Sequence, residues 1–551
     1  MEASDLNPLD RIALCFSGGG FRAAAFNLGT LSYFNKIMFK KEPLLMRVEG
    51  LSTVSGGTLV GAAYAAHTSK GKNFQQFYQD FWQWLAEDKL LDKALKNLQS
   101  DELWKNTTKR RSLINAFAIS YHEVVTQATM ADLYQHAHLK DICFNSTDFS
   151  FGLAFRFQTP NSDFGNYRLK SDELDKLRGT FKVADAMAAS SCFPLGFEPM
   201  IMPDDFFEDH DNPDYKELKS MDYMRTGIGL MDGGIVDNQG IGSIMNADKR
   251  REKDNRQFDL IMVCDVASYK MEPWEMSHTT PGKGKGSFFN LWRKWSTRNR
   301  FLTLSILFTV STLLLLWFGL KADIDQGQST LLIFLAGLTG FLSLAGFGFW
   351  LLGRLSLKGA AWLFDLLHER LLPSFLRGKL GYFSRLRFNL LSRILKERLS
   401  SGVKMVNEVF LKQVRRLNYN LFYSKDELKN RRITSLIYEL TRDEFLRSES
   451  DERTKNMKKA EQIILPKPSE KLFNAAQIAT DTGTTLWFDE NDRKLSRLKN
   501  LVACGQFTTC YNLLDYIVKL PKEYQTQDIL TLKAALEGDW KTFNHDPFWL
   551  V

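Results

Sequence analysis

The chain has 551 residues, 44% of them hydrophobic and 25% charged, which is the composition of a globular protein with room for roughly two to four domains. Its 72 Lys and Arg residues against 64 Asp and Glu residues give a modest net charge of +8, so the position of the charge matters more than its size. The six cysteines lack paired metal-ligand spacing. Cys15, Cys192 and Cys264 stand in or beside apolar stretches, which favours reduced, buried thiols in a cytosolic domain over a disulfide framework.

The first predicted element is a short buried strand over residues 11–16. It leads into Ser17-Gly18-Gly19-Gly20-Phe21-Arg22 and then into a helix predicted over residues 23–39. Three glycines between a strand and a helix let backbone N–H groups converge on an anion, either a phosphate or the oxyanion of acyl transfer. A nucleotide site lacks support, because there is no Gly-Lys-Ser/Thr ending and no Gly-x-Gly-x-x-Gly pattern. A purely structural turn is the remaining interpretation.

The second predicted strand begins at residue 48 and ends in Thr53-Val54-Ser55-Gly56-Gly57, before a helix predicted over residues 59–66. Strand, sharp turn and helix form the context in which a serine hydroxyl is exposed at the edge of an α/β sheet. The usual motif is Gly-x-Ser-x-Gly, and Thr53 stands at its first position. Taken alone, such a stretch is more often an ordinary loop than a nucleophile turn.

Further along the chain, residues 141–157 predict two strands around a turn, and residues 182–191 predict a helix of small residues. Asp232 then stands on a turn made by Gly233 and Gly234. Such a turn is common without function, but an aspartate within hydrogen-bond reach of a serine can act as its base. Residues 258–266 predict a continuous buried strand.

Two stretches in the second half, residues 301–320 and 331–352, contain no charged residue. Each has about the 20 residues that cross a bilayer core, so together they predict a transmembrane helical hairpin. The basic residues lie on its outer flanks, and the short link between the stretches carries Asp323 and Asp325. The positive-inside rule therefore places both flanks in the cytoplasm. The flanking basic residues are Arg293, Lys294, Arg298, Arg300, Arg354 and Lys358.

A basic segment follows over residues 370–399, with Arg and Lys interleaved among apolar side chains. Adhesion to anionic lipid headgroups is the simplest interpretation directly after a membrane span, while nucleic-acid binding and simple packing on the globular domain are alternatives. Residues 403–422 and 427–446 predict helices, and residues 480–518 predict a turn and a helix that close a core.

Taken together, these motifs resemble the patatin-like phospholipases. The matching residues are Ser17-Gly18-Gly19-Gly20-Phe21-Arg22 for the family's glycine loop, Thr53-Val54-Ser55-Gly56-Gly57 for its serine motif and Asp232-Gly233-Gly234 for its aspartate motif. The stretch Ala188-Ala189-Ser190-Ser191-Cys192-Phe193-Pro194 and Asn238 are similar to the family as well, and Gly483-Thr484-Thr485-Leu486-Trp487 looks like a distant return of the same fold. The resemblance covers about residues 10 to 270.

The resemblance implies a three-layer α/β/α domain with a catalytic Ser–Asp dyad and no histidine. By position, Ser55 is the expected nucleophile, Asp232 the base, and Gly18, Gly19 and Gly20 the oxyanion donors. Arg22 is expected to orient the glycine loop or a lipid phosphate. No metal or cofactor motif is present, and none is expected.

We therefore expect a multi-pass membrane protein with two spans and a cytoplasmic lipid acyl hydrolase that cleaves carboxylic esters of phospholipids. Its expected parts are residues 1–285 (the main hydrolase part), 286–400 (the hairpin and basic segment) and 401–551 (a mostly helical part that completes or packs on the hydrolase). A lysophospholipase, an acylglycerol lipase, a broad esterase and a catalytically silent membrane scaffold are the alternatives. The expected partners are membrane phospholipid and the bilayer, not nucleic acid, and a regulatory partner or ligand remains open.

Overall fold

The structure is a computed structural model that describes residues 7–160, 164–168, 172–267, 274, 300–321, 328–366, 388–451, 465 and 467–551. The chain forms two compact units. One combines Met1–Met271 with Asn407–Val551, and the other is Glu272–Val406.

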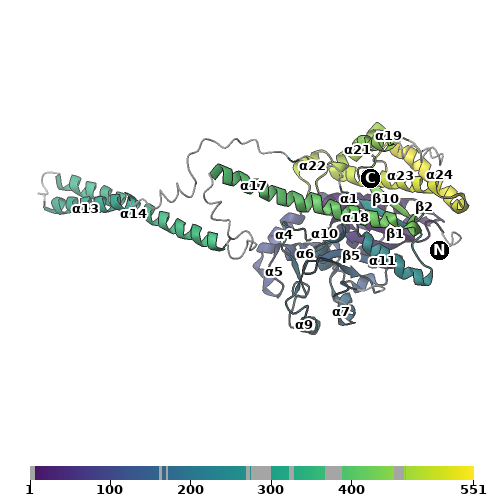
Figure 1. The fold of residues 1–551 in the computed structure, drawn as a ribbon, viewed down its shortest axis with the longest axis horizontal. Helices are drawn as coiled ribbons and strands as arrows, with labels where there is room; N and C mark the ends of the chain where they lie inside the picture. Colours follow the sequence, from purple (N-terminus) through teal and green to yellow (C-terminus); the bar gives the residue numbers. More distant parts are fainter. Residues whose placement is uncertain are drawn as a thin grey trace. The chain divides into compact units, whose positions relative to one another are not determined.

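A mixed β-sheet forms the centre of the first unit (Figure 1). Five neighbouring strands are parallel, and three at one end are antiparallel to their partners. The parallel strands, in spatial order, are β10 (Arg432–Leu436), β9 (Leu260–Asp265), β1 (Ile12–Phe16), β4 (Val48–Val54) and β5 (Asp141–Asp148). The others are β8 (Ile228–Asp232), β7 (Met200–Met202) and β6 (Leu153–Gln158), which pairs with β5.

Both faces of the sheet are covered by helices, because successive side chains of a strand point to opposite faces. In β1, Ile12, Leu14 and Phe16 belong to the larger apolar core, whereas Ala13 and Cys15 belong to the smaller one. The larger core contains α1 (Gly20–Lys36), α2 (Gly56–Ser69) and α23 (Arg497–Lys519), and the smaller contains α11 (Ile241–Arg251) and the end of α18 (Leu411–Ser424). The predicted three-layer α/β/α architecture is confirmed.

The C-terminal residues belong to the same unit as the sheet. Helix α23 lies beside α1 (Figure 1), and two glycines allow the backbones to touch. A Cβ on Gly29 would lie 2.1 Å from the Val502 carbonyl oxygen, and one on Gly505 would lie 1.9 Å from that of Phe26. Larger side chains at these positions would therefore force the two helices apart.

The helix predicted over residues 427–446 is wrong in its central part. Residues Arg432–Leu436 form strand β10, which pairs with β9 in parallel register. The sequence of this strand, RITSL, contains β-branched residues, and β9 would otherwise have an open edge. Pairing in the sheet thus overrides the weak local helical preference.

The second unit contains two long apolar helices, α13 (Arg300–Lys321) and α14 (Gln328–Leu366). Phe301–Lys321 and Leu331–Leu352 are long and apolar enough to cross a membrane, and only 6% of the apolar stretch of each is buried. Hydroxyl groups connect the helices, with Ser305 Oγ donating to the Ser343 carbonyl (2.8 Å) and Thr312 Oγ1 to Thr339 Oγ1 (2.9 Å). The apolar stretch was predicted to end at residue 352, but the helix continues, because Arg354 and Lys358 are compatible with helix.

The remaining elements connect or cover these. Residues 370–387 of the predicted basic segment lie outside the described residues, and helix α17 (Phe388–Lys404) contains the rest. The other helices are α3 (Phe74–Glu87), α4 (Leu90–Gln99), α5 (Asp101–Lys105), α6 (Leu113–Val124), α7 (Asp172–Leu177), α8 (Val183–Ser190), α9 (Pro213–Ser220), α10 (Gly234–Asp237), α19 (Arg442–Ser450), α21 (Glu470–Thr480), α22 (Glu490–Lys494) and α24 (Gln527–His545). Strands β2 (Met38–Phe39) and β3 (Glu42–Pro43) form a separate small sheet.

Candidate active site

The sheet topology brings the predicted serine and aspartate together. Strand β4 pairs with the first half of β5 in parallel, and β8 pairs with the second half in antiparallel orientation. Strand β6 occupies the opposite edge of β5 along both halves, so β4 and β8 share one edge and meet end to end. Val54 lies opposite Asn145, and Asp232 lies opposite the next residue, Ser146. Ser55, which follows Val54, therefore emerges beside Asp232.

Ser55 occupies a sharp turn between β4 and α2. Its φ of 50° and ψ of −119° are unusual for a residue with a side chain, and its backbone N–H donates to Ser190 Oγ at 3.0 Å. The two glycines after it are required by close backbone contacts. A Cβ on Gly56 would lie 2.1 Å from the Gly20 carbonyl oxygen, and one on Gly57 would lie 2.5 Å from that of Phe16. The strained turn leaves Ser55 only partly buried, as a nucleophile requires.

Thr53 replaces the usual glycine of the motif without opening the turn. It lies within β4 and is fully buried, and its hydroxyl donates to Thr58 Oγ1 at 3.0 Å. Thr58 Oγ1 in turn hydrogen-bonds with Ser190 Oγ at 2.8 Å. The threonine therefore joins a group of hydroxyls beneath Ser55.

Asp232 is 4% exposed, and the Ser55 hydroxyl is near enough to act on the pKa of its carboxylate. The Gly234 N–H donates to its Oδ1 at 2.7 Å. Burial raises the pKa of Asp232 from 3.8 to about 6, and the Ser55 hydroxyl and the Gly234 N–H oppose this rise. Throughout the described part of the chain, no Lys, Arg or His forms an ion pair with this carboxylate. It thus keeps a basicity suited to accepting a proton near neutral pH.

The glycine loop lies directly against Ser55. A Cβ on Gly18 would be 3.2 Å from Ser55 Cβ, and the Gly18 N–H donates to the Asn238 carbonyl oxygen at 3.0 Å. The N–H groups of Gly19 and Gly20 have no hydrogen-bond acceptor among the residues that the structure describes. Gly20 has a φ of 58°, and Gly19 one of 151°. The Gly19 and Gly20 N–H groups are therefore not engaged by the described residues, whereas the Gly18 N–H is.

The Arg22 side chain is buried in the protein and contacts a distant part of the chain. Its guanidinium is 7% exposed, and Nη1 donates to the Thr482 carbonyl oxygen at 2.9 Å. Burial lowers the pKa of Arg22 to about 10. The neighbouring Phe21 N–H donates to the Thr485 carbonyl oxygen at 2.8 Å. These contacts favour the first of the two expected roles, orienting the loop, over binding of a lipid phosphate.

Two contributors to the site were not predicted as such from the sequence. Ser190 Oγ, which receives the Ser55 N–H, itself donates to the Asn145 carbonyl oxygen at 2.6 Å. The carbonyls of Thr482 and Thr485 hold the glycine loop from a distant part of the chain. Ser190 and residues 483–487 belong to the sequence resemblance to the patatin-like phospholipases, but no spacing rule predicts their contacts. Among the histidines that the structure describes, none hydrogen-bonds to Ser55 or Asp232.

A comparison with protein families places these residues in a known context. The family described as patatin-like phospholipase matches residues 14–244, the range that contains every predicted site residue. The chain carries a patatin-like phospholipase domain. This patatin-like domain supports lipid hydrolase activity. A search of curated proteins found no match.

Proposed function

We propose that the protein is a membrane-anchored lipid acyl hydrolase that cleaves carboxylic esters of phospholipids, with Ser55 as nucleophile and Asp232 as base. The observation that carries this proposal is the strand register that brings Ser55 beside the buried Asp232, where the Ser55 hydroxyl acts on the pKa of the carboxylate. A hydroxyl is a weak nucleophile until a base accepts its proton. Asp232 suits this role, because burial raises its pKa and no cation neutralises it within the described residues.

The reaction would proceed in two steps. Ser55 Oγ attacks the ester carbonyl carbon while Asp232 accepts the hydroxyl proton, and the N–H groups of Gly19 and Gly20 stabilise the oxyanion. The tetrahedral intermediate collapses to an acyl-serine, and Asp232 returns the proton to the departing alcohol. Asp232 then takes a proton from water, which attacks the acyl-serine; the fatty acid is released as Asp232 returns the proton to Ser55 Oγ. Gly18, whose N–H is engaged by Asn238, would hold the loop closed.

The two apolar helices support the membrane part of the proposal. Phe301–Lys321 and Leu331–Leu352 would cross the bilayer as a hairpin, and hydroxyl contacts such as Ser305 with Ser343 would join them. Tethering raises the effective concentration of the hydrolase at the bilayer that contains its substrate. The basic flanks of the hairpin support a cytoplasmic hydrolase domain, which would act on the inner leaflet.

Activity is tested by fatty-acid release from mixed phospholipid vesicles, using the full chain purified in detergent. Wild type should release fatty acid, and Ser55→Ala and Asp232→Asn should each lose at least about a thousandfold of the rate. Ser69→Ala, at the other end of α2, is the matched control and should be unaffected. Equal rates for Ser55→Ala and wild type would refute the proposed nucleophile.

Topology is tested by labelling with a membrane-impermeant thiol reagent on intact cells. A cysteine introduced at Asp323 should react from outside, whereas one introduced at Lys429, in the hydrolase unit, should react only after the cells are opened. All six native cysteines are buried, so the background should be low. External labelling at position 429 would overturn the cytoplasmic assignment.

A further inference from the structure

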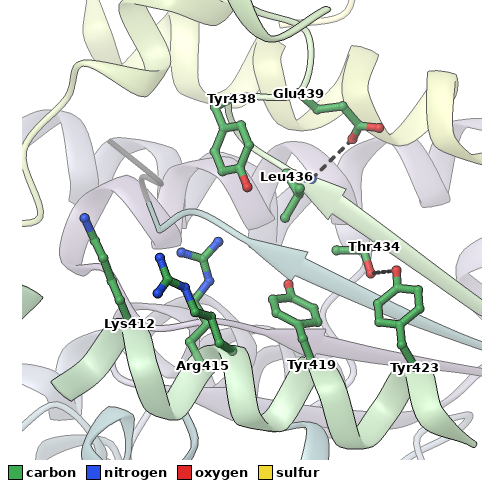
Figure 2. A pocket seen from close by; sticks show the side chains of 9 residues that line it. Lys412, Arg415, Tyr419, Tyr423, Thr434, Leu436, Tyr438 and Glu439 are labelled. Atoms are coloured by element: carbon green, nitrogen blue, oxygen red, sulfur yellow. Dashed lines mark hydrogen bonds between the residues drawn. The ribbon is translucent and has the colours of Figure 1, made fainter. Parts of the chain in front are cut away.

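A cavity of about 460 Å³ lies between helix α18 and strand β10, and it includes none of the residues of the candidate active site (Figure 2). Lys412, Arg415, Tyr419 and Tyr423 project from one helix toward the strand in this view. The lining is completed by Arg416, Thr434, Leu436, Tyr438 and Glu439. A volume of this size is suited to a small molecule.

The lining combines positive charge with aromatic rings. Arg415 Nε donates to the buried carboxylate of Asp265 at 2.7 Å, and Lys412 and Arg416 are the other basic residues of the lining. Arg415 is 8% exposed, whereas Arg416 is exposed and has no ion-pair partner among the described residues. Arg416 therefore adds a positive charge, unpaired within the described residues, to a lining that also contains Lys412 and the buried Arg415, which is paired with Asp265.

The single acidic residue of the lining is already engaged. Glu439 accepts a hydrogen bond from Asn512 Nδ2 at 2.9 Å and one from the Leu436 N–H at 3.4 Å (Figure 2). Burial raises the pKa of Glu439 to about 7, so its negative charge is only partly expressed at neutral pH. The Glu439 carboxylate thus offsets only part of the positive charge around it.

We propose that this cavity binds a small phosphate-bearing molecule, with the phosphate on Lys412, Arg415 and Arg416 and the less polar part against the tyrosine rings. Guanidinium groups match phosphate oxygens in geometry, and several cations together favour a multiply charged anion over a carboxylate. Tyr419, Tyr423 and Tyr438 supply flat apolar surfaces with polar tips, which suits a ligand with both characters. The phosphate could come from a soluble metabolite or from a lipid headgroup.

Helix α18 also connects this cavity to the candidate active site. Asn418 Nδ2 donates to Asp237 Oδ1 at 3.2 Å, and Asp237 ends helix α10, which begins two residues after Asp232. On the cavity side, Gln239 Nε2 donates to Asp265 Oδ2 at 3.4 Å. Gln239 directly follows Asn238, whose carbonyl oxygen accepts the Gly18 N–H. A ligand that shifts α18 would therefore alter hydrolysis; this regulatory part rests on the proposed function.

Binding is measured first, because it does not depend on hydrolysis. Inorganic pyrophosphate is titrated into the full chain in detergent by calorimetry, with chloride at equal ionic strength as the blank. We expect saturable binding that Arg416→Glu and Lys412→Glu each weaken at least about tenfold. Lys429→Glu, an exposed charge reversal outside the cavity, should change it less than about twofold.

A comparison of phosphatidylglycerol vesicles with pyrophosphate shows whether the phosphate belongs to a lipid headgroup or to a soluble molecule. If the Arg416 dependence is seen with vesicles of phosphatidylglycerol but not with pyrophosphate, the ligand is a headgroup; the reverse result identifies a soluble phosphate. Equal behaviour of Arg416→Glu and Lys429→Glu with both probes would overturn the site and leave the proposed hydrolase untouched.

Coupling is read from the rate of fatty-acid release with and without the probe that binds. Saturating probe should change the rate of wild type at least about threefold, and Asn418→Ala should reduce that change while retaining binding. Binding without any change in rate would overturn the regulatory part alone.

Discussion

Two buried aspartates, Asp232 and Asp265, each end a strand of the same sheet, yet their surroundings are opposite. Burial raises the pKa of Asp232, and among the described residues only the Ser55 hydroxyl and the Gly234 N–H oppose this rise. Nothing in the described part of the chain compensates its charge with a cation.

Asp265 is fully buried as well, but it is surrounded by donors. Arg415 Nε donates at 2.7 Å, Tyr419 Oη at 2.8 Å and the Ala267 N–H at 2.9 Å. The comparison teaches that burial alone does not indicate a role. A buried carboxylate paired with a cation anchors the fold, whereas one without a cation costs stability and is retained where its basicity is used.

The largest expected difference between the two is catalytic. Asp232→Asn should lower the rate of fatty-acid release at least about a thousandfold, because an amide cannot accept the serine proton. Asp265→Asn should retain activity to within about tenfold at a temperature where it remains folded, because its side chain does not reach Ser55. Rates per folded molecule, measured on the same vesicles, separate these outcomes, and similar losses in both variants would contradict the assignment.

The next largest effect is a loss of stability when Asp265 is replaced. Asp265→Asn leaves the buried Arg415 guanidinium without its counterion, so the free energy of unfolding should fall by about 3 kcal/mol. Denaturant unfolding of the full chain in detergent, followed by tryptophan fluorescence, measures this. The double variant Asp265→Asn, Arg415→Met should recover part of the loss, and no recovery would argue against the ion pair as the cause.

Asp232→Asn should raise the free energy of unfolding, whereas Asp265→Asn should lower it. Burial raises the pKa of Asp232 from 3.8 to about 6, so the folded state binds the proton more tightly than the unfolded state. Stability from this group is therefore present below pH 3.8 and is lost as pH rises toward 6. Above pH 6, the asparagine variant should be more stable than wild type by up to about 3 kcal/mol. An unfolding comparison at pH 5 and pH 8 checks that the gain is larger at pH 8.

The same pKa predicts the pH dependence of hydrolysis. The carboxylate form of Asp232 is the base, so kcat/KM should rise with pH to a plateau above about 6 and fall about tenfold for each pH unit below it. The measurement uses a soluble ester substrate to avoid pH effects on vesicles. A profile without inflection between pH 5 and pH 7 would remove Asp232 from the role of base.

The smallest effect tests the departure from the serine motif. Thr53→Val removes the hydrogen bond to Thr58 but keeps the shape, so the free energy of unfolding should fall by about 1 kcal/mol and activity should stay within about threefold. Thr53→Gly should cost more stability, because the Thr53 methyl packs against Gly61 of α2. A large gain in activity in Thr53→Gly would show that the threonine impairs the turn.

The sequence by itself determined the features that depend on neighbouring residues. The glycine loop, the serine turn, the aspartate turn and the two charge-free stretches are local patterns, because turn sterics and bilayer thickness act over a few residues or one helix. The three-layer class also followed from the motifs and their family resemblance, and the structure agrees.

The tertiary structure alone decided how distant segments complete these patterns. That β4 and β8 meet end to end on β5, that Arg22 binds the Thr482 carbonyl and that Arg432–Leu436 is a strand are all outcomes of long-range packing. Local preference in such segments is weak, and an open strand edge or an unsatisfied buried donor outweighs it. The contrast between Asp232 and Asp265 arises in the same way, because the cation that separates them comes from α18, 150 residues beyond Asp265 in the chain.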